Sequence, residues 1–174
     1  MPHSGAAMPG DDFDPQRILG LLTARGVDFV VIGGIAAVLH GSPRTTQDLD
    51  VCFATDNANL DALGKVLTEL DARLRGVPDD IPFAPDRDSL RRVEVLTLET
   101  SAGDFDVLAR PDGAPPYARL RQNADRYDLG AFAVLVASVE DLLAMKRAAG
   151  RAKDLGDIEE LTAIARLRAR LQDG

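Results

Sequence analysis

The chain has 174 residues, a formal net charge of −8 and one cysteine. This length suffices for the core of one domain without disulfides or a structural metal, and the single Cys52 excludes both a disulfide framework and a zinc cluster. No apolar run reaches the roughly 20 residues that span a bilayer, and no secretory signal is recognisable, so a cytoplasmic protein without a membrane partner is expected.

Short polar segments and glycines divide the first part of the chain into predicted elements. Residues 1–12 are small, polar and acidic, and we expect a disordered tail there, before a single domain over residues 13–174. An aspartate followed by a proline has the pattern of a helix N-cap and first turn, which predicts a helix over residues 14–26. The apolar run at residues 28–32 predicts a buried strand, followed by a short helix over residues 35–40.

Apolar periodicity and turn residues predict the remaining elements as well. They are a strand at 49–53, a helix at 57–74, a loop at 76–89, a hairpin of strands at 93–98 and 105–108 around Gly103, a connector at 111–116, a second hairpin at 127–129 and 132–136 around Gly130, a helix that begins at Ser138, and a last helix over 154–171. This order predicts an α+β fold, with a mixed β-sheet, flanking helices and two C-terminal helices.

The pair Asp48 and Asp50 lies at the start of the strand predicted at residues 49–53. Residues two apart in a strand point to the same side, so both carboxylates face one way while Leu49 and Val51 face the core. Neighbouring carboxylates repel each other, and a cation between them relieves the repulsion. Carboxylate oxygens suit Mg²⁺, with Mn²⁺ as a substitute, and paired acids of this kind serve phosphoryl transfer. Because an isolated Asp-x-Asp is common in turns, this interpretation depends on its surroundings.

Gly33 and Gly34 follow a buried strand and open a helix about fifteen residues before the aspartate pair. Glycines at such a place let the backbone approach a ligand, and a helix N-terminus offers free amides to an anion. Together with the aspartates they predict a phosphate cradle beside a metal site. Arg44, Thr45 and Thr46 lie between the two motifs and offer further phosphate contacts. The alternatives are a plain strand-to-helix turn for the glycines and a surface ion pair for Arg44.

A third acid, Asp106, lies between Phe105 and Val107 in a later predicted strand. Asp104 shares its face of the strand and competes with it for the same role. We favour Asp106, because Asp104 lies beside the turn glycine at the hairpin end. In this interpretation, Asp106 binds a metal and accepts the proton of an attacking hydroxyl.

Lys146 occupies the inward stripe of the helix that begins at Ser138, at helical spacing from Val139, Leu142 and Leu143. A lysine on such a stripe needs a negative partner or a route to solvent. Two interpretations remain open: a contact to a nucleoside triphosphate, or an ion pair with a nearby carboxylate.

These motifs resemble those of the nucleotidyltransferase superfamily related to DNA polymerase β. Among its branches the chain is most similar to the small prokaryotic ones, the minimal nucleotidyltransferases and the AbiEii-type toxins. The resemblance extends from about Val27 to Leu171, and it rests on the pattern Gly33-Gly34-Ile35-Ala36-x3-His40-Gly41-x2-Arg44-x-Thr46-x-Asp48-Leu49-Asp50 and on Ser138-x-Glu140-Asp141-Leu142-Leu143-x2-Lys146 with Asp154 and Asp157 beyond it.

The resemblance implies transfer of a nucleoside monophosphate from a nucleoside triphosphate to an acceptor hydroxyl, with release of pyrophosphate. It makes Gly33 and Gly34 part of the triphosphate cradle and makes Asp48, Asp50 and Asp106 the metal ligands. A lysine and a downstream acid on the C-terminal helices also belong to the site in AbiEii-like members, and Lys146 and either Asp154 or Asp157 match those places. Acids in a first helical turn also complement the helix dipole, which is the structural alternative for both aspartates.

Three hypotheses about function follow from the motifs and the resemblance. The first is a toxin that modifies RNA or protein and is paired with an antitoxin protein. The second is an enzyme that modifies a small molecule such as an aminoglycoside or lincosamide antibiotic. The third is a non-catalytic nucleotide-binding descendant, and the presence of all three carboxylates counts against it. An acidic pocket on the acceptor side would favour a cationic antibiotic.

Overall fold

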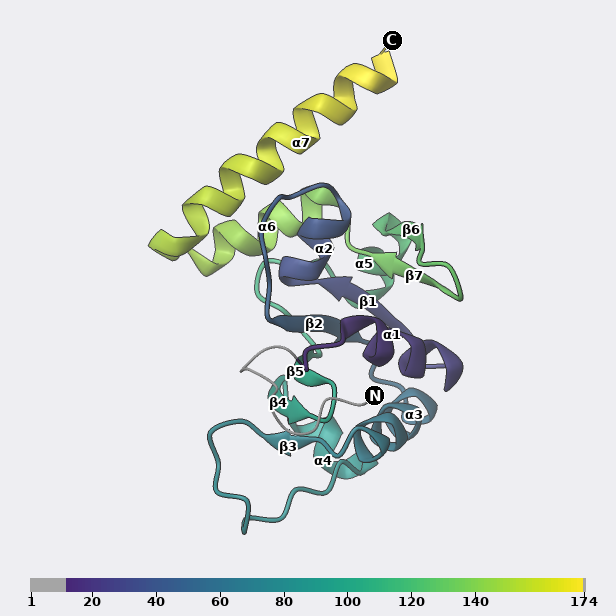
Figure 1. Ribbon diagram of the computed structural model, residues 1–174. Coiled ribbons are helices and arrows are strands. Elements are labelled where there is room, and N and C mark those ends of the chain that lie inside the picture. Colours follow the sequence, from purple (N-terminus) through teal and green to yellow (C-terminus); the bar gives the residue numbers. More distant parts are fainter. Residues whose placement is uncertain (1–11, 174) are drawn as a thin grey trace, which may run out of the picture.

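A seven-stranded sheet organises residues 12–173, the part of the chain that the computed structural model describes (Figure 1). The strand order is β3-β4-β5-β2-β1-β7-β6. The strands are β1 (Phe29–Ile32), β2 (Asp48–Phe53), β3 (Arg73–Leu74), β4 (Val95–Thr100), β5 (Gly103–Leu108), β6 (Asp125–Asp128) and β7 (Ala133–Val136). The pairs β2–β5 and β1–β7 are parallel and the other four are antiparallel, so the predicted mixed sheet is confirmed.

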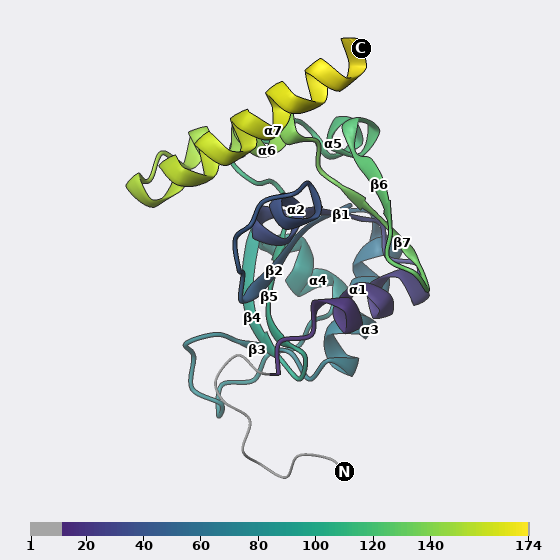
Figure 2. The same ribbon diagram turned by 45° about the horizontal axis from the view of Figure 1, so that its top comes forward.

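Helices cover the sheet on one face and at one end (Figure 2). They are α1 (Pro15–Ala24), α2 (Gly33–Leu39), α3 (Asn57–Glu69), α4 (Arg87–Arg92), α5 (Tyr117–Asn123), α6 (Val139–Ala149) and α7 (Leu155–Asp173), with a 3₁₀ turn η1 (Ala152–Asp154) before the last. In both views α6 and α7 lie side by side above α2, and the C-terminal half of α7 projects beyond them. The α+β class with two C-terminal helices is therefore confirmed.

The core lies between the sheet and the helices α1, α3 and α4. Inward residues of β2 and β5, among them Leu49, Val51, Phe105 and Val107, are fully buried. Since side chains alternate along a strand, the residues between them face the opposite side of the sheet, and this is where the aspartates lie. Burial of the apolar face thus fixes the orientation of the polar one.

Two predicted helix starts have the expected caps. The side chain of Asp14 accepts a hydrogen bond from the amide of Arg17 at 3.0 Å, and that of Ser138 accepts one from the amide of Asp141 at 3.1 Å. Each satisfies an amide that the first helical turn leaves free. Residues 1–11 of the expected disordered tail lie outside the described residues.

The structure differs most from the predicted elements in three places. The helix predicted at 57–74 ends at Glu69, because the chain turns through Asp71, whose φ is +52°, and then forms β3. The loop predicted at 76–89 contains the start of α4, which Asp86 caps by accepting from the amide of Ser89. The helix α5 was not predicted at all, since Leu120 is its single buried residue and leaves no apolar period to recognise.

No helix among residues 12–173 has the length and apolar character required to cross a membrane.

Candidate active site

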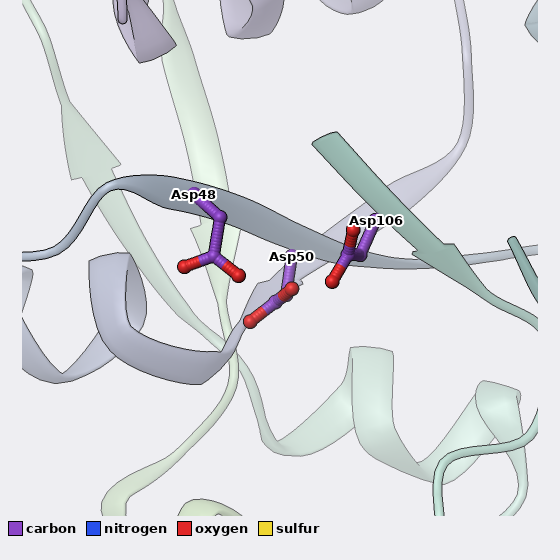
Figure 3. A group of neighbouring side chains, drawn as sticks. All are labelled: Asp48, Asp50 and Asp106. Carbon is purple, nitrogen blue, oxygen red and sulfur yellow. The ribbon is translucent and has the colours of Figure 1, made fainter. Parts of the chain in front are cut away.

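The strands β2 and β5 place three carboxylates side by side (Figure 3). These strands are parallel neighbours, and their register pairs Asp50 with Asp106 and Asp48 with Asp104. Asp48, Asp50 and Asp106 each offer one carboxylate oxygen, and these three oxygens lie within 4.8 Å of one another. Asp104 lies outside this group, with a side chain that is 45% exposed.

The three carboxylates lie so close together that ionisation of all three is unfavourable in the empty site. Burial, followed by repulsion from Asp48 and Asp106, raises the pKa of Asp50 to about 8. Burial also raises the pKa of Asp106, although a hydrogen bond from Arg75 opposes this. Without a cation, Asp50 therefore keeps its proton at neutral pH, and its carboxyl group donates this proton in a hydrogen bond to Asp106. Three oxygen donors that cannot all ionise alone are a set that fits a hard divalent cation.

Gly33 and Gly34 face the carboxylates from the first turn of α2. Gly33 has a φ of +69°, and a Cβ built there would lie 2.1 Å from Oδ2 of Asp50. A Cβ on Gly34 would lie 2.9 Å from Oγ1 of Thr46, and that hydroxyl donates to the carboxylate of Asp48 at 3.2 Å. A Cβ would displace the side chain of Asp50 at Gly33 and that of Thr46 at Gly34, so only glycine fits at either position without displacement.

The same carboxylates line a cavity of about 530 Å³. Four cationic side chains, those of Arg44, Lys146, Arg151 and Lys153, also line it, together with the acids Asp154 and Asp157. A cavity lined by both carboxylates and cations suits a ligand that carries both a metal ion and several phosphates.

Lys146 is held by two carboxylates from the neighbouring turn and helix. Its Nζ lies 3.2 Å from Oδ1 of Asp154 and 2.8 Å from Oδ2 of Asp157, and both acids are nearly buried. Arg44 also pairs with Asp157, and Arg151 pairs with Asp154 at 2.7 Å. These ion pairs lower the pKa of both aspartates. Lys146 and Arg44 thus make the ion pairs of the structural alternative and still line the cavity.

One residue of this region was missed by sequence reasoning. Nη2 of Arg75 donates to Oδ1 of Asp106 at 2.8 Å, from the end of β3. The residue lay at the end of a predicted helix and beside a predicted loop, so no local pattern connected it with Asp106. The sheet order, in which β3 is two strands from β5, was the missing information.

Replacing Lys146 with alanine is expected to change both stability and ligand binding. The free energy of unfolding without ligand should fall by about 1–3 kcal/mol, because Asp154 and Asp157 lose one cation but each keeps an arginine. Affinity for a nucleoside triphosphate should weaken by about 1.5–3 kcal/mol. Thermal unfolding and nucleotide titration measure the two effects.

Arg147→Ala is the matched control, since Arg147 is the exposed cation next to Lys146 on the same helix. This variant should change neither quantity by more than about 0.5 kcal/mol. A Lys146→Ala protein that loses stability but binds the nucleotide as the unaltered protein does would remove Lys146 from the ligand site.

Comparison with known proteins agrees with this geometry. A family model described as the nucleotidyl transferase AbiEii toxin of a type IV TA (toxin–antitoxin) system matches residues 21–171. The match covers both strands that carry the aspartates, the glycine turn and the two C-terminal helices. No curated protein sequence matches the chain.

Three solved structures have a similar fold at low sequence identity. A lincosamide antibiotic adenylyltransferase, LnuA, with lincomycin bound has a TM-score of 0.56 and 19% identity, over 86% of this chain and 95% of that one. The enzyme ANT(2″)-Ia in complex with adenylyl-2″-tobramycin has a TM-score of 0.54 and 16% identity, over 91% and 95% of the two chains. An antigenic nucleotidyltransferase-like protein from Paracoccidioides brasiliensis has a TM-score of 0.53 and 19% identity, over 86% and 73%.

Proposed function

Because the chain belongs to the AbiEii nucleotidyl transferase toxin family and is therefore a nucleotidyltransferase, we propose that it joins a nucleoside monophosphate to an acceptor hydroxyl at the cluster of Asp48, Asp50 and Asp106. The observation that carries this proposal is the convergence of three carboxylate oxygens within 4.8 Å, directly opposite Gly33. In the reaction, a bond forms between the acceptor oxygen and the α-phosphorus. The bond from that phosphorus to the β-phosphate oxygen breaks, and pyrophosphate leaves.

Asp48, Asp50 and Asp106 would hold Mg²⁺, for which Mn²⁺ is a substitute. When bound, such an ion neutralises charge on the reacting phosphate. Asp106 is the residue assigned to accept the proton of the acceptor hydroxyl. It lies at the side of the cluster that faces β4.

The triphosphate is assigned to the space between the glycine turn and the cationic side chains that line the cavity. Gly33 and Gly34 leave room for phosphate oxygens next to the backbone. Thr46 contributes a hydroxyl beside Asp48, and Arg44 and Lys146 contribute positive charge that Asp157 holds in place. In this arrangement Asp154 and Asp157, which also line the cavity, orient the cations.

Family membership favours a toxin that modifies RNA or protein under the control of an antitoxin. One observation favours the second candidate, a small cationic acceptor. Glu99 and Asp104 are register partners on β4 and β5, and they add two carboxylates to the face of the sheet that carries Asp106, beside Arg73 and Arg75. The carboxylates of this face, those of the cluster included, attract an amine-bearing molecule. A cytoplasmic location, where nucleoside triphosphates are available, stays a prediction.

The test is incubation with each of the four α-³²P nucleoside triphosphates, Mg²⁺ and total cell extract, followed by separation of RNA, protein and small molecules. Label in RNA or protein supports the toxin hypothesis, and label in a small cationic compound, such as an added aminoglycoside, supports the second. If no pool is labelled with any of the four nucleotides, the proposal is wrong.

A further inference from the structure

Arg75 belongs to a row of residues that crosses four strands and ends at the acid cluster. Its amide donates to the carbonyl of Thr97 at 2.9 Å, Thr97 pairs with Asp106 across β4 and β5, and Asp106 pairs with Asp50 across β5 and β2. The arginine therefore reaches the cluster from the edge of the sheet.

The guanidinium group is held by two hydrogen bonds from one nitrogen and by one looser ion pair. Nη2 donates to Oδ1 of Asp106 at 2.8 Å and to the carbonyl of Leu98 at 2.9 Å. Nε lies 3.5 Å from Oδ2 of Asp104, in an ion pair without hydrogen-bond geometry. The side chain of Asp106 is only 16% exposed, so its contact with Arg75 is shielded from water. An arginine held in this way keeps both its position and its charge.

We propose that Arg75 is a positioning residue, a resident cation that holds Asp106 in the carboxylate cluster before any metal ion binds. The inference rests on the proposed function, because it assumes that the cluster is the metal site. Three carboxylate oxygens within 4.8 Å repel one another, and Arg75 supplies a permanent positive charge against this repulsion. The same charge weakens the attraction of the cluster for an added cation, so Arg75 sets the metal affinity as well as the geometry.

Arg75 acts through Asp106 and does not contact the nucleotide. It is not among the residues that line the cavity, whereas the other cations near the cluster, Arg44 and Lys146, are. Its role is therefore separable from theirs. Removing Arg75 changes the cation site and leaves the phosphate-binding side chains of Arg44 and Lys146 intact.

The experiment measures binding of Mn²⁺ alone by electron paramagnetic resonance, without nucleotide or acceptor, and the thermal unfolding of the same samples. Arg75→Gln is expected to bind Mn²⁺ at least about tenfold more tightly than the unaltered protein, because a unit charge changes the affinity for a nearby divalent ion by about this factor in water and by more in a shielded site. It should also unfold at a lower temperature without metal and gain more from Mn²⁺. Arg75→Lys, which keeps the charge, should restore the original Mn²⁺ affinity to within about threefold.

Arg73→Gln is the matched control. Arg73 lies two positions earlier on β3 and pairs only with exposed acids, Asp71 at 3.0 Å and Asp79 at 3.5 Å. This variant removes the same unit of charge from the chain, and it should leave Mn²⁺ affinity unchanged.

An Mn²⁺ affinity of Arg75→Gln that is equal to that of the unaltered protein, or weaker, would overturn the role of Arg75 and leave the proposed function standing. If the unaltered protein fails to bind Mn²⁺, the proposed metal site itself is wrong. Should Arg75→Gln fail to fold without metal, saturating Mn²⁺ is expected to restore folding, because the ion replaces the missing charge. A variant that stays unfolded in Mn²⁺ would contradict the proposal.

Discussion

Replacing Asp50 with asparagine is expected to stabilise the metal-free protein and, at the same time, to lower metal-dependent nucleotidyl transfer by about 10³-fold. Both effects have one cause. Asp50 is buried beside Asp48 and Asp106, and this environment raises its pKa to about 8. The charge that the reaction requires is therefore a charge that the empty fold tolerates poorly.

The stability effect depends on pH in a defined direction. The folded protein retains a proton on Asp50 up to a pH of about 8, whereas the unfolded chain releases it near 3.8. Because the folded state binds the extra proton, the free energy of unfolding falls as pH rises through this window, and the full cost is present above it. At pH 8.5 the free energy of unfolding of the Asp50→Asn protein should exceed that of the unaltered one by several kcal/mol, and at pH 4 the two should be nearly equal.

Urea unfolding at several pH values, with a chelator present, measures this difference. Asp112→Asn is the control, since Asp112 is exposed and lies outside the group of three. Its stability should follow the same pH curve as the unaltered protein. An Asp50→Asn protein that shows no gain in stability at high pH would mean that Asp50 is not held in a repulsive site.

Replacing Gly33 with alanine is expected to abolish metal binding and transfer. The Cβ would lie 2.1 Å from Oδ2 of Asp50, far inside van der Waals contact, so the Asp50 side chain must leave the cluster. The left-handed backbone, with a φ of +69°, adds about 1–2 kcal/mol of strain. Mn²⁺ titration and a transfer assay should both report a loss of at least about 100-fold.

Gly41→Ala separates strain from contact. Gly41 also has a positive φ, +115°, but no atom lies within 4 Å of a Cβ built there. This variant should lose stability by a similar 1–2 kcal/mol and keep its Mn²⁺ affinity. If both variants bind Mn²⁺ equally well, the close approach of Gly33 to Asp50 has no functional importance.

The parts of the site that lie on one strand or one turn could be predicted from the sequence. The alternation of Leu49 and Val51 with Asp48 and Asp50 was sufficient to place two carboxylates on the face opposite the core. The preference for Asp106 over Asp104 rested on its distance from the turn glycine, and the register of β5 on β2 does pair Asp106 with Asp50.

The parts that depend on sheet order or on helix packing could not be predicted. Arg75 reaches Asp106 only because β3 lies at the edge of the sheet beside β4. For Lys146, a negative partner was one of two interpretations left open, but its position on a helical stripe could not decide that Asp154 and Asp157 share it. Those contacts arise from the turn at η1, which folds the start of α7 back against α6.

The central claim, that the carboxylate cluster transfers a nucleoside monophosphate, is tested most directly by comparing two labels of one nucleotide. The protein is incubated with Mg²⁺, an extract that contains the acceptor, and the same nucleoside triphosphate labelled with ³²P at either the α- or the γ-phosphate. We expect the acceptor to gain the α-label and not the γ-label, and we expect this transfer to disappear in Asp50→Asn and to persist in Asp112→Asn. Transfer of the γ-label, or α-label transfer that survives Asp50→Asn, would contradict the account.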